Sequence, residues 1–186
     1  MRSLLFLALG LVACRSTALG PYTPPGEAHR ETVAAELLSR QGAAAMATDL
    51  DTAEGLLREA LTKDLFYGPA HNNLGVVFLK QDKLYEAANE FEWARKLLPD
   101  SPDPRVNLAL VMERAGRSDE AFRAYEAALE VAPDCLPATE GAALCAVRHG
   151  RDEVRLDGWL RTISLRGETE QWRTWAISQT ARGGSL

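Results

Sequence analysis

Residues 68–101 read GPAHNNLGVVFLKQDKLYEAANEFEWARKLLPDS, and residues 102–135 read PDPRVNLALVMERAGRSDEAFRAYEAALEVAPDC. The two stretches follow each other without a gap, and at a spacing of 34 residues they match in kind at seven positions. The matched pairs are Leu74 and Leu108, Gly75 and Ala109, Phe78 and Met112, Ala87 and Ala121, Phe91 and Tyr125, Ala94 and Ala128, and Pro99 and Pro133. A fixed period of this length, with apolar residues three and four apart, predicts a stack of paired helices.

The matched positions resemble the tetratricopeptide repeat. In that family, small residues at the eighth and twentieth positions let two helices approach closely, and proline at the thirty-second ends the second helix. Large residues at the seventh, eleventh and twenty-fourth positions fill the space around the contact. The aromatic fourth position is His71 in one repeat and Arg105 in the other, so both depart from the pattern there. The resemblance implies an all-α solenoid of helical hairpins.

The same register extends in both directions with weaker matches. In residues 34–67 the second helix fits well, but Gln41 occupies the small eighth position and Gly42 comes one place later. In residues 136–169 Arg155 stands where alanine belongs. We therefore expect a tetratricopeptide domain over 30–167, with a divergent repeat on each side of the two clear ones.

A further helix is predicted over residues 168–182, before a short tail at 183–186. Its first turn is acidic, and Trp172 and Trp175 share one face. We interpret it as a cap over the apolar end of the stack. Docking of the two tryptophans at a membrane interface is the alternative, which the scarcity of basic residues along this helix disfavours.

The N-terminal segment differs from the rest of the chain. Residues 1–13 combine a basic residue with a short apolar run, which predicts a signal peptide. Residues 11–14, Leu-Val-Ala-Cys, resemble the bacterial lipobox, which implies that Cys14 carries acyl chains such as palmitate and begins the mature lipoprotein. The alternative is a chance cysteine in an ordinary signal.

The segment after the cysteine is rich in proline and glycine, so residues 14–29 are expected to form a flexible tether that reaches up to about 45 Å. The residue after the cysteine is Arg15 and not aspartate. This favours attachment to the outer membrane, facing the periplasm, over retention in the inner membrane.

The composition excludes several functional classes. The 186 residues carry a formal net charge of −5 without a basic face, so nucleic acid is not an expected partner. His29, His71 and His149 are scattered without metal-ligand spacing, and no phosphate loop or nucleophile motif occurs. We expect no catalytic residue, metal or cofactor.

The two cysteines after the tether are expected to be free. Cys135 and Cys145 are separated by about 12 Å if a helix begins at Pro137, which is beyond disulfide reach. We interpret both as small buried residues, with an interchain bridge as the alternative.

In the tetratricopeptide family the first helix of each repeat lines a concave binding surface. Carried over position by position, the resemblance implies ten groove residues here: Asn72, Asn73, Val76, Leu79, Lys80, Val106, Asn107, Leu110, Glu113 and Arg114. Asn73 and Asn107 both occupy position six, where relatives use asparagine to hydrogen-bond an extended peptide. The alternative is that asparagine is merely frequent there. Leu38 and Gly42 replace the residues that clamp a carboxyl terminus in chaperone-binding members, so a chaperone-tail receptor is not expected.

These features together predict a membrane-anchored periplasmic adaptor that is not an enzyme. Its partner would be another envelope protein or an extended segment of one, for example in the assembly of a pilus or secretion secretin or of outer-membrane proteins. The alternative is a structural or self-associating envelope protein without a peptide ligand. Different experiments separate the two, because only the first requires an accessible groove.

Overall fold

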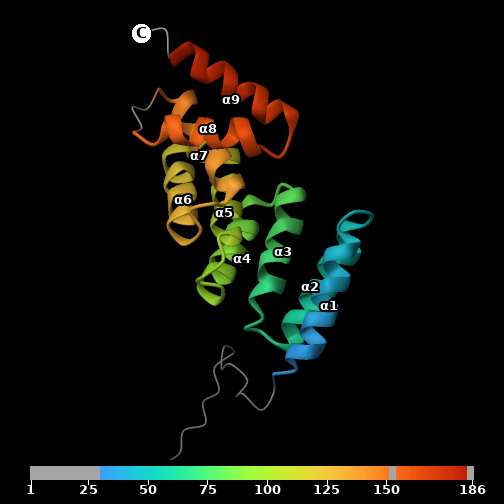
Figure 1. Ribbon diagram of the computed structural model, residues 1–186. Coiled ribbons are helices and arrows are strands. Elements are labelled where there is room, and N and C mark those ends of the chain that lie inside the picture. The colour runs from blue at the N-terminus through green and yellow to red at the C-terminus, as the bar shows by residue number, and fades with distance from the viewer. Residues whose placement is uncertain (1–29, 151–153, 184–186) are drawn as a thin grey trace, which may run out of the picture.

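The computed structural model describes residues 30–150 and 154–183, and this part of the chain forms nine helices and no strand (Figure 1). The helices are α1 (Thr32–Ala45), α2 (Leu50–Lys63), α3 (Gly68–Lys80), α4 (Leu84–Leu97), α5 (Asp103–Arg114), α6 (Ser118–Val131), α7 (Leu136–Arg148), α8 (Leu156–Arg166) and α9 (Glu170–Gly183). The hairpins α1–α2, α3–α4 and α5–α6 stack side by side, which confirms the predicted all-α solenoid. None of the helices within these residues is long and apolar enough to cross a membrane. The predicted signal peptide, Cys14 and the tether lie outside the described residues.

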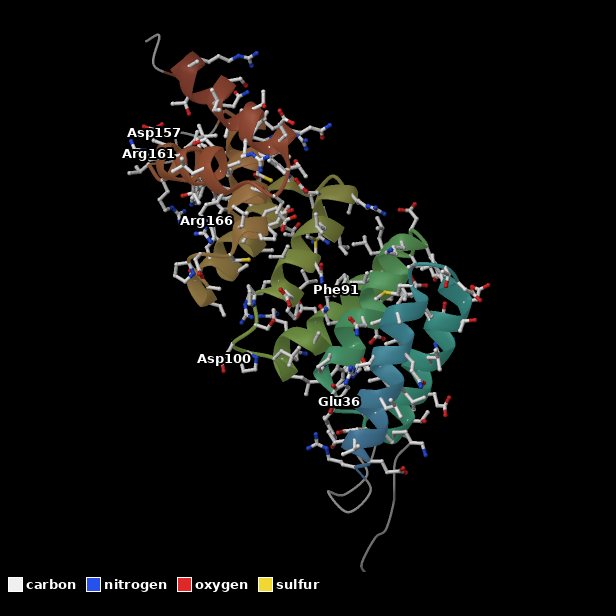
Figure 2. The ribbon with its side chains drawn as sticks, turned by 45° about the vertical axis from the view of Figure 1, so that its right-hand side comes forward. Glu36, Phe91, Asp100, Asp157, Arg161 and Arg166 are labelled. Atoms are coloured by element: carbon white, nitrogen blue, oxygen red, sulfur yellow. The ribbon has the colours of Figure 1, made fainter. Side chains whose placement is uncertain are left out.

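Close contact between a glycine and an aromatic ring holds the α3–α4 hairpin together. A Cβ atom added to Gly75 would lie only 2.5 Å from Cε1 of Phe91, whose side chain is fully buried between helices (Figure 2). Ala87 and Ala94 on α4 are fully buried as well. The small and large residues of the repeat pattern therefore make the contacts that the sequence predicts.

The turns between paired helices repeat a left-handed residue. Positive φ angles occur at Asp82 (61°), Gly116 (72°) and Gly150 (58°), each 34 residues from the next. In the first of these turns the N–H of Lys83 donates to the carbonyl of Phe78 at 2.9 Å, a hydrogen bond that closes the end of α3. The repeat is thus visible in backbone conformation as well as in packing.

The first hairpin differs in register from the sequence alignment. Gly42, and not Gln41, is the buried small residue, and a Cβ on it would lie 2.7 Å from Cγ of Leu57. The small residue of this hairpin therefore lies one place after the eighth position of the projected register. The α1–α2 turn differs as well, because Met46 keeps the right-handed helical conformation and none of the residues in this turn has a positive φ angle.

The C-terminal end is capped by two helices. Helix α8 contacts α9 more extensively than it contacts α7, and in Figure 1 it lies across the end of the stack. Trp172 and Trp175 meet edge to face at 5.4 Å between ring centroids and pack against the core, as a cap requires. The last unit thus differs from a regular fourth hairpin, in which α7 and α8 would be the main partners. Arg155 explains part of this difference. Its guanidinium lies 4.8 Å from the ring centroid of Trp159 and pairs with Glu126, so it does not form a close helix contact.

A buried carboxylate fixes the first described residues. Asp64, 1% exposed, accepts hydrogen bonds from Arg30 Nε (3.0 Å) and Nη2 (3.2 Å), from the Thr32 hydroxyl (2.8 Å) and from the N–H of Phe66 (3.0 Å). Burial favours the neutral acid, but these donors outweigh it and hold the pKa of Asp64 below its usual value. The N–H of Glu31 adds a bond of 3.0 Å to the carbonyl of Lys63, the last residue of α2.

Candidate functional site

A shallow depression of about 320 Å³ lies where α3, α5 and the start of α7 meet. Its lining residues are Asn72, Asp103, Val106, Asn107, Leu110, Cys135 and Pro137. Four of them, one from α3 and three from α5, belong to the predicted groove set. The depression therefore spans the first helices of successive repeats, which is the side that the family resemblance implies.

The asparagine amides link neighbouring repeats. Nδ2 of Asn107 donates to Oδ1 of Asn72 at 3.0 Å, and Nδ2 of Asn73 donates to the hydroxyl of Ser39 at 3.3 Å. All three amides are only partly buried. A side-chain amide has two N–H donors and one carbonyl acceptor, so Asn73 and Asn107 each keep an N–H and an oxygen for a peptide unit.

The apolar residues of the predicted set differ in exposure. Leu79 (8% exposed) and Val106 (9%) are buried in the packing of the stack, and Val76 is half-buried. Leu110 is 39% exposed and lines the depression. It is therefore the apolar member that offers most surface to a ligand, whereas Leu79 contributes to the core.

Glu113 and Arg114 are engaged within the fold. The carboxylate of Glu113 accepts hydrogen bonds from the hydroxyl of Tyr125 (3.1 Å) and from Sγ of Cys145 (3.4 Å), so it joins α5 to α6 and α7. Burial, reinforced by the charge of Glu113, raises the pKa of Tyr125 well above its usual value. Nη1 of Arg114 donates to the carbonyl of Leu79 at 2.8 Å and ties α5 to the end of α3.

The depression also contains residues that the sequence prediction omitted. Asp103 and Pro137 occupy position two of their repeats, which belongs to the family's groove set, so applying that position consistently identifies both. Cys135, which also lines the depression, lies two residues before Pro137. It is free and only half-buried, which corrects the expectation that both cysteines are buried; Cys145 is free and 1% exposed, as expected. Burial still raises the pKa of the Cys135 thiol.

His71, at the family's aromatic fourth position, has a structural role. It is 4% exposed; Nδ1 lies 2.6 Å from a carboxylate oxygen of Glu90 and Nε2 lies 2.9 Å from the carbonyl oxygen of Leu65. Its ring stacks on Trp93 at 5.8 Å. The imidazole thus joins α3 to α4 and to the α2–α3 connection. Within the described residues, no three His, Cys, Asp or Glu side chains converge as a metal site would require.

Comparison with known proteins supports the repeat assignment. The tetratricopeptide repeat family model matches residues 74–130 and 106–161. The crystal structure of MamA is similar at a TM-score of 0.60 and 20% identity, over 82% of this chain and 81% of that chain. The first tetratricopeptide domain of Spaghetti (RPAP3), bound to the HSP90 peptide SRMEEVD, gives 0.62 and 17% over 66% and 98%.

The Arabidopsis OM64 tetratricopeptide domain gives a TM-score of 0.60 and 18% identity, over 63% of this chain and 98% of that chain. No curated protein matches the sequence. At these identities the structural similarities show a shared fold, and the tetratricopeptide repeat model matches the part of the chain from residue 74 to residue 161.

Proposed function

We propose that this tetratricopeptide-repeat chain is a non-enzymatic adaptor that binds an extended segment of another protein along α3 and α5. The observation that carries the proposal is the depression in which Asn72 and Asn107 meet beside the exposed Leu110. The amides supply donors and acceptors for a peptide backbone, and the leucine supplies an apolar contact for a side chain. Hairpin packing fixes both helices, so the surface is pre-organised for binding.

Site-specific photo-crosslinking in cells tests this proposal. A photoreactive amino acid replaces Leu110 in one variant and Tyr85 in another, because Tyr85 is 77% exposed and lies on the second helix α4. We expect a discrete protein adduct from position 110 and none from position 85. Equal labelling from both positions would contradict a binding surface on the first helices.

A second variant tests the role of the amide. Asn107→Ala removes the hydrogen bond to Asn72 as well as the groups offered to a ligand, so binding and stability must be measured together. We expect loss of the position 110 adduct, with an unfolding midpoint that still lies above the temperature of the labelling experiment. An undiminished adduct would exclude this amide from the binding surface.

We further propose that the domain acts at the bacterial outer membrane, on the periplasmic side, through lipid on Cys14. The support is the lipobox resemblance of residues 11–14 and the proline-rich segment that follows. The partner is then an envelope protein, for example a component of secretin or outer-membrane protein assembly. Wild-type protein should incorporate labelled palmitate and sediment with membranes, and Cys14→Ser should do neither. Labelling that survives this substitution would overturn the anchor.

Self-association is a second candidate because one end of the stack exposes apolar side chains. Val33 (83% exposed) and Leu37 (59%) lie one turn apart on α1, the first helix of the solenoid. Light scattering after size exclusion tests this candidate. An oligomer that grows with concentration and disappears in Leu37→Glu, without any adduct from position 110, would favour self-association over the adaptor.

A further inference from the structure

Three basic side chains repeat along the first helices. Lys80, Arg114 and Arg148 lie in the last turns of α3, α5 and α7, and each is 34 residues from the next. All three are exposed. Because they share position thirteen of the repeat, they form a column across the same side of the stack, and we call this set the basic column. Arg114 shows where the column lies, since its guanidinium reaches the end of the neighbouring α3.

The three first helices that carry the basic column, α3, α5 and α7, contain three acidic side chains, and two of these are turned away from solvent. Glu113 is held by Tyr125 and Cys145, and Glu140 is 5% exposed, with Oε1 accepting a hydrogen bond from the N–H of Glu168 at 3.2 Å. Asp103 is exposed, but it lies in the first turn of α5, at the opposite end of that helix from the basic column. Asp82, in the turn after α3, does lie beside the column, at 3.7 Å from Nη1 of Arg114, but both side chains of this pair are largely exposed, so the pair is weak.

The second helices have the opposite charge. Helices α4 and α6 together carry seven acidic and three basic side chains. An acidic ligand is therefore repelled by the second-helix side and attracted to the C-terminal ends of the first helices. The cations also interact favourably with the helix dipoles, which explains one cation per helix but gives no reason for the acid-rich second helices.

We infer that the ligand of the groove is an extended acidic peptide whose carboxylates, three residues apart, contact the basic column; this inference rests on the proposed function. The spacing follows from geometry. Neighbouring packed helices are about 8–10 Å apart. A polyproline-type peptide advances about 3.1 Å per residue and presents every third residue on one face, which gives about 9 Å between successive acidic side chains. The asparagine amides at position six then lie beside the peptide backbone.

Binding of synthetic peptides to the purified full-length chain tests this inference. Three fluorescent peptides of ten residues have the same length: one with glutamate at every third position, one with the same glutamates adjacent, and one with glutamine in their place. Fluorescence anisotropy gives the affinities at low and high salt. Three exposed ion pairs of ordinary strength correspond to about five- to tenfold in affinity, so we expect the spaced peptide to bind that much more tightly than the glutamine peptide. High salt should reduce the difference.

Charge reversal assigns the effect to the column. The test variant combines Lys80→Glu and Arg148→Glu, and spares Arg114 because its guanidinium also holds α3. Arg123→Glu is the matched control, an exposed arginine on the second helix α6. We expect the double variant to lose the preference for the spaced peptide and the control to keep it. Circular dichroism verifies that both variants are folded.

The outcomes separate this inference from the proposed function. Equal affinity for the spaced and glutamine peptides, with both weakened by Asn107→Ala, overturns the acidic ligand and leaves the adaptor intact. Equal affinity for spaced and adjacent glutamates overturns the three-residue spacing. No binding by any peptide, together with no adduct from position 110, overturns both proposals.

Discussion

Asp82, Gly116 and Gly150 hold equivalent places in three successive turns, and only the first of them has a side chain. A left-handed backbone brings Cβ close to the following carbonyl oxygen, which costs most L residues about 1–2 kcal/mol. Among the described residues, the side chain of Asp82 makes a 3.7 Å ion pair with Arg114, in which both side chains are largely exposed. Such a pair contributes little.

Asp82→Gly should therefore stabilise the protein by about 0.5–1 kcal/mol. The urea midpoint of the full-length chain measures the change. Gly116→Ala introduces the same strain at the next turn, where nothing lies within 4 Å of the new Cβ, so its effect is conformational. It should lower the midpoint. A lower midpoint for Asp82→Gly would mean that the ion pair outweighs the backbone strain.

Two glycines in helix interiors should respond in opposite directions to alanine. A Cβ on Gly75 would lie 2.5 Å from the buried ring of Phe91, whereas a Cβ on Gly55 in α2 meets nothing within 4 Å. Gly75→Ala should destabilise by about 1–3 kcal/mol through overpacking. Gly55→Ala should stabilise by about 0.5–1 kcal/mol, because alanine favours the helix. A higher midpoint of thermal unfolding for Gly75→Ala would refute the close contact.

At the scale of helices, the buried Asp64 makes stability depend on pH. Its pKa is lower in the folded protein than in the unfolded chain, so its contribution is fully present above about pH 4, the unfolded value, and is lost as the pH falls through the lower folded value. Asp64→Asn should cost about 1–3 kcal/mol at pH 7, because Arg30 loses a buried charged partner.

Urea unfolding at several pH values checks this expectation. The difference between wild type and Asp64→Asn should shrink below pH 4, as the wild-type carboxyl becomes protonated. Asp100→Asn is the matched control, since Asp100 is exposed in the α4–α5 connection and carries its charge away from the core (Figure 2). A constant difference between the Asp64 variant and wild type across the pH range would exclude the buried pair as its cause.

The sequence predicted the central hairpins, because their packing is set by residues a fixed distance apart in the chain. Gly75 and Phe91 could be paired from spacing alone. The first and last units could not be placed so well. The close contact of the first hairpin falls on Gly42, one place after the projected position, and α8 contacts α9 more extensively than it contacts α7.

The candidate site was predicted less completely than the fold. Spacing placed Asn107 and Leu110 on one surface, since helical periodicity determines which face a residue occupies. It did not show that the carboxylate of Glu113 turns toward Tyr125 and Cys145, because that orientation depends on side chains from two other helices. The exposure of a groove side chain thus depends on side chains of the neighbouring repeats, so it cannot be predicted from the sequence of one repeat.

At the scale of the whole molecule, the core consists of two clusters that meet on α5. Val106 and Ala109 belong to the cluster that runs toward α9, and Leu108 and Val111 to the cluster that runs toward α2. Helix α5 is therefore covered on both sides. Among the described residues, helix α1 packs against α2 and α3.

Hydrogen exchange should follow this arrangement. We expect the slowest amide exchange in α4, α5 and α6 and faster exchange in α1 and α9, because terminal units of a repeat stack lose fewer neighbours on opening. Mass spectrometry of peptides from the exchanged full-length chain measures the profile. Uniform protection across the helices would indicate that the stack opens as one unit.

The contacts of Asp64 also determine how the folded body carries mechanical load. A pull on the chain before Arg30 meets two hydrogen bonds from Arg30, one from Thr32 and the backbone bond from Glu31 to Lys63. These bonds connect three consecutive residues, 30–32, to the C-terminal end of α2 and the residue after it. Part of the tension therefore reaches the C-terminal end of α2 as well as the first turn of α1. A partner held in the groove of a tethered molecule would thus pull on the assembled stack.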